Sequence, residues 1–166
     1  AMAGHDPADP ASADVPVPDF RAGLGRGVKG LRIGLVRHFH EADNPVSAAT
    51  LKGIEDAAAF FRAEGAEVGD VTLPSLAEFN ACGWIILLSE AFAVHEAWMR
   101  RDAQMYGELL RDRLVLGGLL TAADYLAAQK KRLELTARTA AAVAGCDLLL
   151  TAAQPGEAPR IDAVPK

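Results

Sequence analysis

The chain has 166 residues, of which 51% are hydrophobic and 23% charged, with a formal net charge of −5 and a mean hydropathy of +0.11. This composition is typical of one globular domain with a buried core and excludes disorder over most of the length. The acidic balance, with no basic run longer than Lys130-Lys131-Arg132, makes nucleic acid a poor partner. Two cysteines without a C-x-x-C spacing fit a reduced, cytoplasmic setting.

The chain divides into three parts by composition. Residues 1–30 are rich in proline and glycine and are predicted to form an extended segment. Gly25 to Gly30 match G-x-G-x-x-G, but the motif precedes a predicted strand where a nucleotide-binding loop must follow one, so we expect a flexible approach. Residues 31–151 are predicted to be an α/β domain section, and residues 152–166 an irregular tail.

The α/β section begins with a strand, a helix and a second strand. Leu31–Val36 is a short apolar run of the kind found in buried strands of parallel or mixed sheets. Asp43, Asn44 and Ser47 are candidate N-caps for a helix that Gly65 ends, and Ala66–Leu73 is predicted to be the second strand. This order predicts a βαβ unit with parallel strands.

A long helix, Leu76–Arg101, is the most prominent predicted element. Between Ala81 and Ala93 its only strongly polar side chains are Ser89 and Glu90, which predicts a central helix buried on all sides. The same two residues interrupt the apolar run before it reaches the length of a membrane span, so we expect no membrane contact.

Two further helices and a strand complete the prediction. One helix is expected over Met105–Leu116, with Tyr106, Leu109, Leu110 and Leu114 on its buried side. The other is expected from Thr121 to Ala144, with a capping-box-like start formed by Thr121 and Asp124. The apolar strand is expected over Asp147–Thr151. The predicted fold class is therefore α/β, a three-layer α/β/α-type fragment with short, mostly parallel or mixed strands and a long buried central helix.

Few residues point to chemistry. None of the four serines lies in a nucleophile motif. The spacing of His38 and His40 would put both on one face of a strand, but no third ligand recurs at a metal spacing. We therefore predict no catalytic serine, metal or cofactor. Glu90 is predicted either to have a structural partner or to face a pocket. His95 lies five residues further on, off the helical face of Glu90, so the two are not expected to act as a pair.

Five segments in order resemble the later part of amidase-signature enzymes: AMAGHDPADPASADVPVPDF, LRIGLV, SEAFAVHEAWM, MYGELLRDRLVLGGLLTAADYLAAQKKR and DLLLTAAQPGEAPRI. The resemblance implies a large mixed sheet between helices and amide hydrolysis by a Lys, cis-Ser, Ser triad. No stretch of this sequence matches the glycine- and serine-rich triad region. The resemblance therefore implies no catalytic residue here, and Glu90 and His95 remain possible substrate-pocket wall residues. SEAFAVHEAW also lacks the Asn-Leu-Ala-Arg-type stretch of the large amidase component of glutamyl-tRNA amidotransferases, which favours a general amidase.

Two functional hypotheses follow. In the first, the chain is a section of an amidase that supplies scaffold and pocket wall, is inactive alone, and works on a small-molecule amide in the full-length enzyme. In the second, it is a self-sufficient, non-catalytic α/β binding or interaction module. A section cut from a larger sheet is also expected to form a homo-oligomer or to associate through an exposed strand edge, at Leu31–Val36 or Asp147–Thr151.

Overall fold

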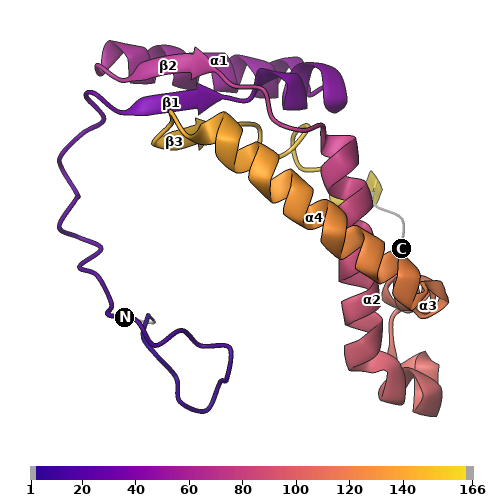
Figure 1. Cartoon of the computed structure of the whole chain (residues 1–166). Helices are drawn as coiled ribbons and strands as arrows, with labels where there is room; N and C mark the ends of the chain where they lie inside the picture. The colour runs from indigo at the N-terminus through magenta and orange to yellow at the C-terminus, as the bar shows by residue number, and fades with distance from the viewer. Residues whose placement is uncertain (1–2, 164–166) are drawn as a thin grey trace.

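A three-stranded parallel sheet forms the centre of the α/β part of the chain (Figure 1). The computed structural model describes residues 3–163. The strands are β1 (Arg32–Leu35), β2 (Glu67–Asp70) and β3 (Leu148–Leu150), in the order β2-β1-β3, and all pairs are parallel. The three strands and their parallel pairing confirm the predicted α/β class. Because β1 is paired on both sides, the expected edge contact at Leu31–Val36 is wrong, and β3 is the remaining candidate.

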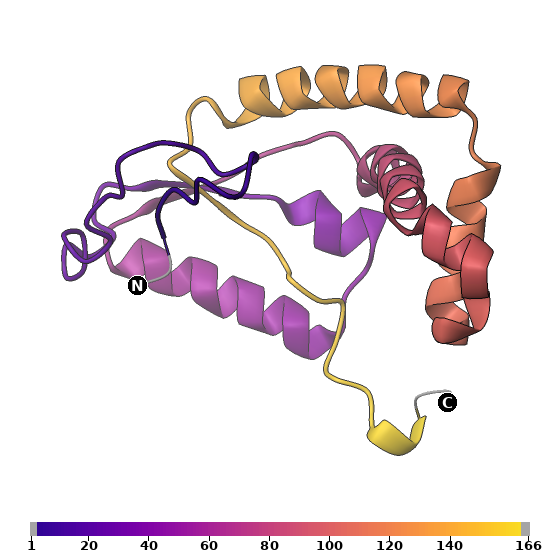
Figure 2. The same cartoon turned by 90° about the horizontal axis from the view of Figure 1, so that it is seen from below.

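Helix α1 (Ala48–Ala63) connects β1 to β2 and lies along one face of the sheet, as Figure 2 shows. The Ser47 side chain caps it by accepting a hydrogen bond from the Thr50 backbone N–H at 3.2 Å. Ala58 on its inner face is fully buried. Gly65 has a φ of +89°, the left-handed conformation that glycine adopts at little cost after a helix.

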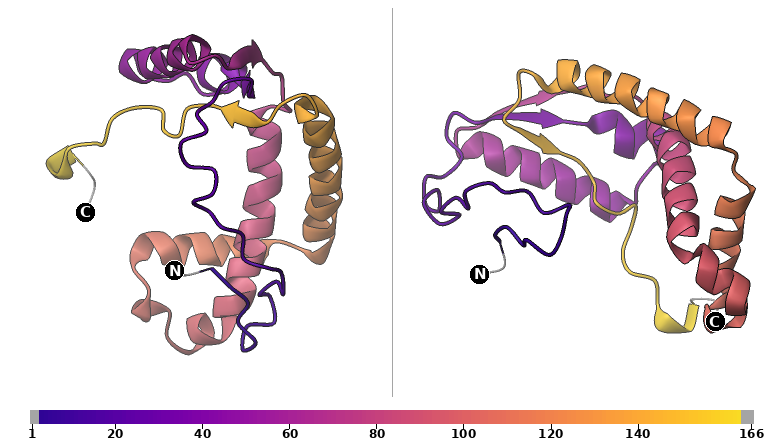
Figure 3. Two further views of the ribbon diagram at one scale, coloured as in Figure 1. Left: turned by 90° about the vertical axis from the view of Figure 1, so that its left-hand side faces the viewer. Right: turned by 60° about the horizontal axis from the view of Figure 1, so that its bottom comes forward.

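Helix α2 (Leu76–Asp102) has the predicted position and length, but the prediction that it is buried on all sides is wrong. Cys82 is its one buried residue, and Trp84, Leu87 and Trp98 are 46%, 57% and 49% exposed. The reason is that the contacts of α2, mainly with α3 and α4, leave much of its circumference uncovered (Figure 3). With the turn that follows, the segment Leu76–Met105 is long and apolar enough to cross a membrane by length and composition alone.

Helices α3 (Glu108–Leu119) and α4 (Ala122–Val143) pack against α2. Helix α3 starts later than predicted because a 3-10 turn, η2 (Ala103–Met105), comes first. Leu114 is buried as expected, whereas Leu109 is 69% exposed. Helix α4 begins with the predicted capping box, in which the Thr121 backbone N–H donates to Asp124 at 2.9 Å.

The two ends of the described chain contain little regular structure. Residues 3–31 have no helix or strand and loop away from the sheet (Figures 1 and 3). After β3 the chain continues without regular structure to the 3-10 helix η3 (Ile161–Ala163).

Candidate functional site

A groove of about 660 Å³ lies between α2 and α4. Its lining is mainly apolar, with a few polar groups: Phe79, Cys82, Gly83, Ile86, Leu87, Glu90, Arg132, Leu135, Thr136, Thr139 and Ala140. Such a lining, with a few polar groups, is typical of sites that receive an apolar group and orient it by hydrogen bonds.

Glu90 lies in this groove but not in the setting that its sequence context predicts. Its side chain is exposed, and its carboxylate accepts a hydrogen bond from the Tyr125 hydroxyl at 2.8 Å. This hydrogen bond raises the pKa of Tyr125, because it stabilises the protonated hydroxyl that donates to Glu90. The expected burial of Glu90 is therefore wrong, and its partner is a tyrosine of α4.

His95 lies outside the residues that line the groove. Its Nδ1 is 2.9 Å from the Tyr106 hydroxyl, and its ring packs edge-on against Tyr106 with centroids 5.5 Å apart. Glu90 and His95 thus have separate partners, in agreement with the prediction that they do not form an acid–base pair.

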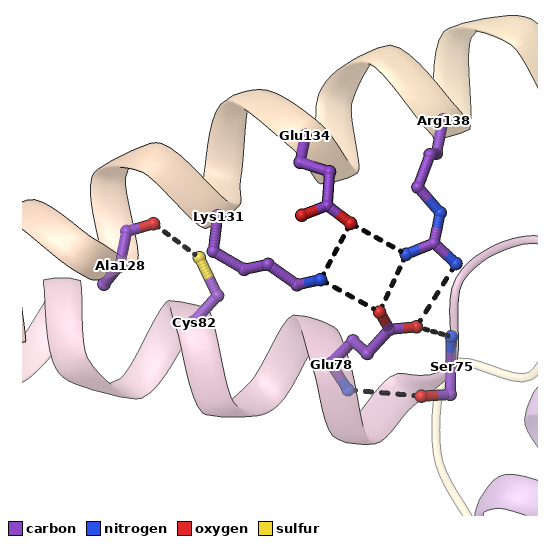
Figure 4. Close-up of polar contacts among 7 residues, drawn as sticks. All are labelled: Ser75, Glu78, Cys82, Ala128, Lys131, Glu134 and Arg138. Carbon is purple, nitrogen blue, oxygen red and sulfur yellow. Dashed lines mark hydrogen bonds and ion pairs between the residues drawn. The ribbon is translucent and has the colours of Figure 1, made fainter.

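A charged cluster joins α2 to α4 at one end of the groove, as Figure 4 shows. Glu78 contacts Arg138 at 2.8 Å and Lys131 at 3.2 Å, and it also accepts from the Ser75 backbone N–H in the capping box of α2. These hydrogen bonds, above all that from Arg138, lower the pKa of Glu78 to about 2. The Cys82 thiol, which also lines the groove, donates a hydrogen bond to the Ala128 carbonyl oxygen at 3.2 Å. This bond between α2 and α4 gives the cysteine a structural role.

A second, smaller pocket of about 270 Å³ lies beside the residues that follow β1 and β3. His40 lines it and is 2% exposed, the one buried polar or charged residue of the described chain. Neither ring nitrogen of His40 has a hydrogen-bond partner within residues 3–163. The sequence suggested that His38 and His40 share a strand face, but His40 lies in a π-helix, η1 (Phe39–Asp43).

The hydrogen bonds and burial of the four serines are typical of structural residues. Ser47 and Ser75 cap α1 and α2. Ser12 accepts a hydrogen bond from the Asp6 backbone N–H at 2.9 Å, and the Ser89 hydroxyl is buried. Within residues 3–163 there is no group of three or more His, Cys, Asp or Glu side chains that could hold a metal ion.

The parallel strands, the helix between β1 and β2 and the long helical layer define an α/β protein with an open apolar groove. Residues 1–166 match the family model described as Amidase, and the chain belongs to the amidase-signature family. A relative from Pseudomonas putida named Amidase is 37% identical over 96% of this chain and 34% of its own length.

Solved structures agree with this assignment. The inhibitor-bound form of a vestigial protein complex, which reveals the evolutionary origins of an s-triazine catabolic enzyme, matches at a TM-score of 0.84 and 30% identity. That match covers 96% of this chain and 34% of the other. An amidase crystal structure matches at a TM-score of 0.74 and 27% identity, over 81% of this chain and 30% of its own. The chain thus spans about a third of the length of the relatives that it matches.

Proposed function

We propose that this chain is a scaffold and pocket-wall section of an amidase-signature C–N hydrolase, which hydrolyses a small-molecule amide only together with the rest of the enzyme. The observation that carries the proposal is the match of nearly the whole chain to about one third of an amidase. Within the whole enzyme the sheet would be the middle of three layers, and the groove between α2 and α4 would be part of the substrate pocket wall, with Glu90 on its rim.

The distribution of apolar surface supports this proposal. Trp84, Leu87, Val94 and Trp98 of α2 are 46–68% exposed, and Leu126 and Leu133 of α4 are 66% and 68% exposed. Single exposed hydrophobic residues are ordinary, but a group of this size on neighbouring helices is typical of a surface that another part of a protein covers. The alternative, a self-sufficient binding module, predicts a closed core and is therefore less well supported.

The serines support inactivity of the chain alone. Covalent acyl transfer needs a nucleophile with an adjacent activating base, and the described contacts give no serine a histidine or lysine partner.

The test measures hydrolysis of simple amides and p-nitrophenyl esters by the purified chain and by a version extended with the remaining segments of an amidase relative. We expect no turnover above buffer from the chain and turnover from the extended version. Turnover by the chain that Ser89→Ala or Cys82→Ala abolishes would contradict the proposal, because it would place a nucleophile within these 166 residues.

A further inference from the structure

The large hydrophobic side chains that α2 exposes form a single stripe along the helix. They are Trp84, Leu87, Val94 and Trp98, which are 46%, 57%, 68% and 49% exposed. With the half-buried Ala91 between them, these residues follow one another at intervals of 3, 4, 3 and 4 positions. We call these five residues the α2 seam.

The spacing of the α2 seam is that of the contact positions of a coiled coil. Apolar residues that repeat every 3.5 positions on average keep one narrow stripe in contact with a partner helix, and each side chain fits between residues of that partner. Cys82 lies on the opposite side of α2 and is buried, with its thiol bonded to the Ala128 carbonyl oxygen of α4. The seam is therefore a second contact face, which no element of the described chain covers.

The α2 seam is too narrow to favour a membrane surface as its partner. A helix that lies on a membrane buries a broad apolar face among the lipids. The exposed positions beside the seam are instead small or charged, namely Gly83, Glu90, Ala97 and Arg101. A second helix fits this pattern better than lipid does.

Two arginines beside the seam favour an acidic partner. The guanidinium of Arg113 lies over the ring of Trp84, 5.8 Å from its centroid. Arg101 continues the spacing of the seam by one further step. Neither arginine belongs to an ion pair within residues 3–163. The carboxylate of Glu90 accepts a hydrogen bond from Tyr125. Charges beside the contact positions determine which helices pair, so carboxylates are expected on the partner.

We propose that the α2 seam binds a helix from the part of the amidase that lies outside these 166 residues, and that this helix has apolar residues at the same spacing with carboxylates beside them. The chain spans about a third of the length of its relatives, so most of such an enzyme lies outside it. This pairing rests on the function proposed above, in which the chain is a section of a longer enzyme, and it adds the kind of element that covers α2.

Tryptophan fluorescence reports on the seam directly, because Trp84 and Trp98 are the two tryptophans of the chain. The purified chain is titrated with a tryptophan-free helical peptide that has leucine at the seam spacing and glutamate beside it. One control peptide has the same composition with the leucines at other spacings, and a second has lysine in place of glutamate. We expect the glutamate peptide to shift the emission to shorter wavelength with saturation, and both controls to bind at least about tenfold more weakly.

Two variants test the position of the contact. Val94→Lys places a charge in the middle of the seam and should weaken binding of the glutamate peptide at least about tenfold. Leu133→Lys is the matched control, because Leu133 of α4 is also 68% exposed but lies outside the seam. Its binding should equal that of the wild type. Arg101→Glu should weaken the glutamate peptide and strengthen the lysine peptide.

The extended version of the chain described above tests where the partner helix comes from. Its own helix should cover the seam, so a dye-labelled glutamate peptide should show no rise in anisotropy with it. Because this readout is binding, an extended version that excludes the peptide but lacks turnover would contradict only the proposed function.

Four results would overturn the pairing. They are equal binding of the peptide with other leucine spacings, unchanged binding by Val94→Lys, binding of the glutamate peptide to the extended version, and an emission shift with phosphatidylcholine–phosphatidylglycerol vesicles but not with the peptide. An emission shift on concentrating the chain alone that Val94→Lys abolishes would likewise assign the seam to a second copy of the chain.

Discussion

At the scale of single residues, one glycine sets how closely α3 approaches α2. A Cβ atom on Gly117 would lie 2.1 Å from the carbonyl oxygen of Leu88 and 2.9 Å from the Cβ of Phe92. Both atoms belong to or lie next to the backbone of α2, which cannot move aside as a flexible side chain can. The contact between the helices therefore depends on the absence of a side chain at this position.

We expect Gly117→Ala to lower the free energy of unfolding by about 1–3 kcal/mol, the usual cost of adding a methyl group to a packed contact. Gly83→Ala is the matched control, because Gly83 is also helical and a Cβ there meets no atom within 4 Å. That substitution should raise stability by about 0.5–1 kcal/mol through helix propensity. Urea unfolding of both variants checks the pair, and a neutral Gly117→Ala would mean that α3 is not held against α2 in this way.

Two features of single residues could not be predicted from the sequence: the π-helical conformation of η1 and the burial of His40. The spacing of apolar residues predicts which face of a helix is buried. A single π-helical turn such as Phe39–Asp43 has only five residues, which is too short for a periodic pattern to be recognised in the sequence. The burial of His40 depends on where the chain after β3 returns, which is a long-range contact. By contrast, Ser47 and Thr121 cap their helices as expected, because capping depends only on neighbours in the sequence.

At the scale of elements, the ion cluster around Glu78 is the polar link between α2 and α4. The folded-state pKa of Glu78 is about 2, below its ordinary value of 4.5, because Arg138 and Lys131 stabilise its charged form. A lowered pKa gives stability that is complete above pH 4.5 and is lost as the pH falls through 2. Asp147, whose pKa Arg32 lowers to about 2, titrates over the same range.

We therefore expect the free energy of unfolding to fall as the pH drops from about 5 to 2, and Glu78→Gln to reduce this fall without removing it. The variant should also be less stable than the wild type at pH 7, where the ion pairs are complete. Glu96→Gln is the control, because Glu96 pairs only with Arg100 on the same helix within the described contacts. Denaturant midpoints over this pH range measure the effect, and parallel pH profiles of Glu78→Gln and wild type would contradict it.

The extent to which helix α2 is buried could not be predicted from its own sequence. Its apolar surface extends nearly around the helix, and that pattern indicates burial against something without saying what. Helix α2 packs against α3 and α4, yet Leu87 and Val94 remain 57% and 68% exposed. Short apolar runs such as Leu148–Leu150 predicted the strands correctly, because their neighbours lie within this chain.

At the scale of the whole molecule, the two edges of the sheet differ in their protection. The β2 edge carries Glu67 and Asp70, both exposed, and charges of this kind prevent further strands from pairing. The β3 edge consists of leucines, of which Leu148 is 51% and Leu149 44% exposed. An unprotected apolar edge is a site where another strand can pair, so β3 is the edge at which we expect a further strand to add to the sheet.

The isolated chain should for the same reason self-associate through β3. Light scattering over a concentration series is expected to show dimers or larger species for the wild type, and Leu149→Lys should shift the chain toward monomer by placing a charge on this edge. Glu67→Lys is the control: it changes a charge on the β2 edge and should leave association unchanged. If the wild type is monomeric at high micromolar concentration, the β3 edge is closed in solution. If Leu149→Lys associates as strongly as the wild type, the contact instead forms through the exposed helices, where burial of apolar surface contributes about 25 cal/mol per Å².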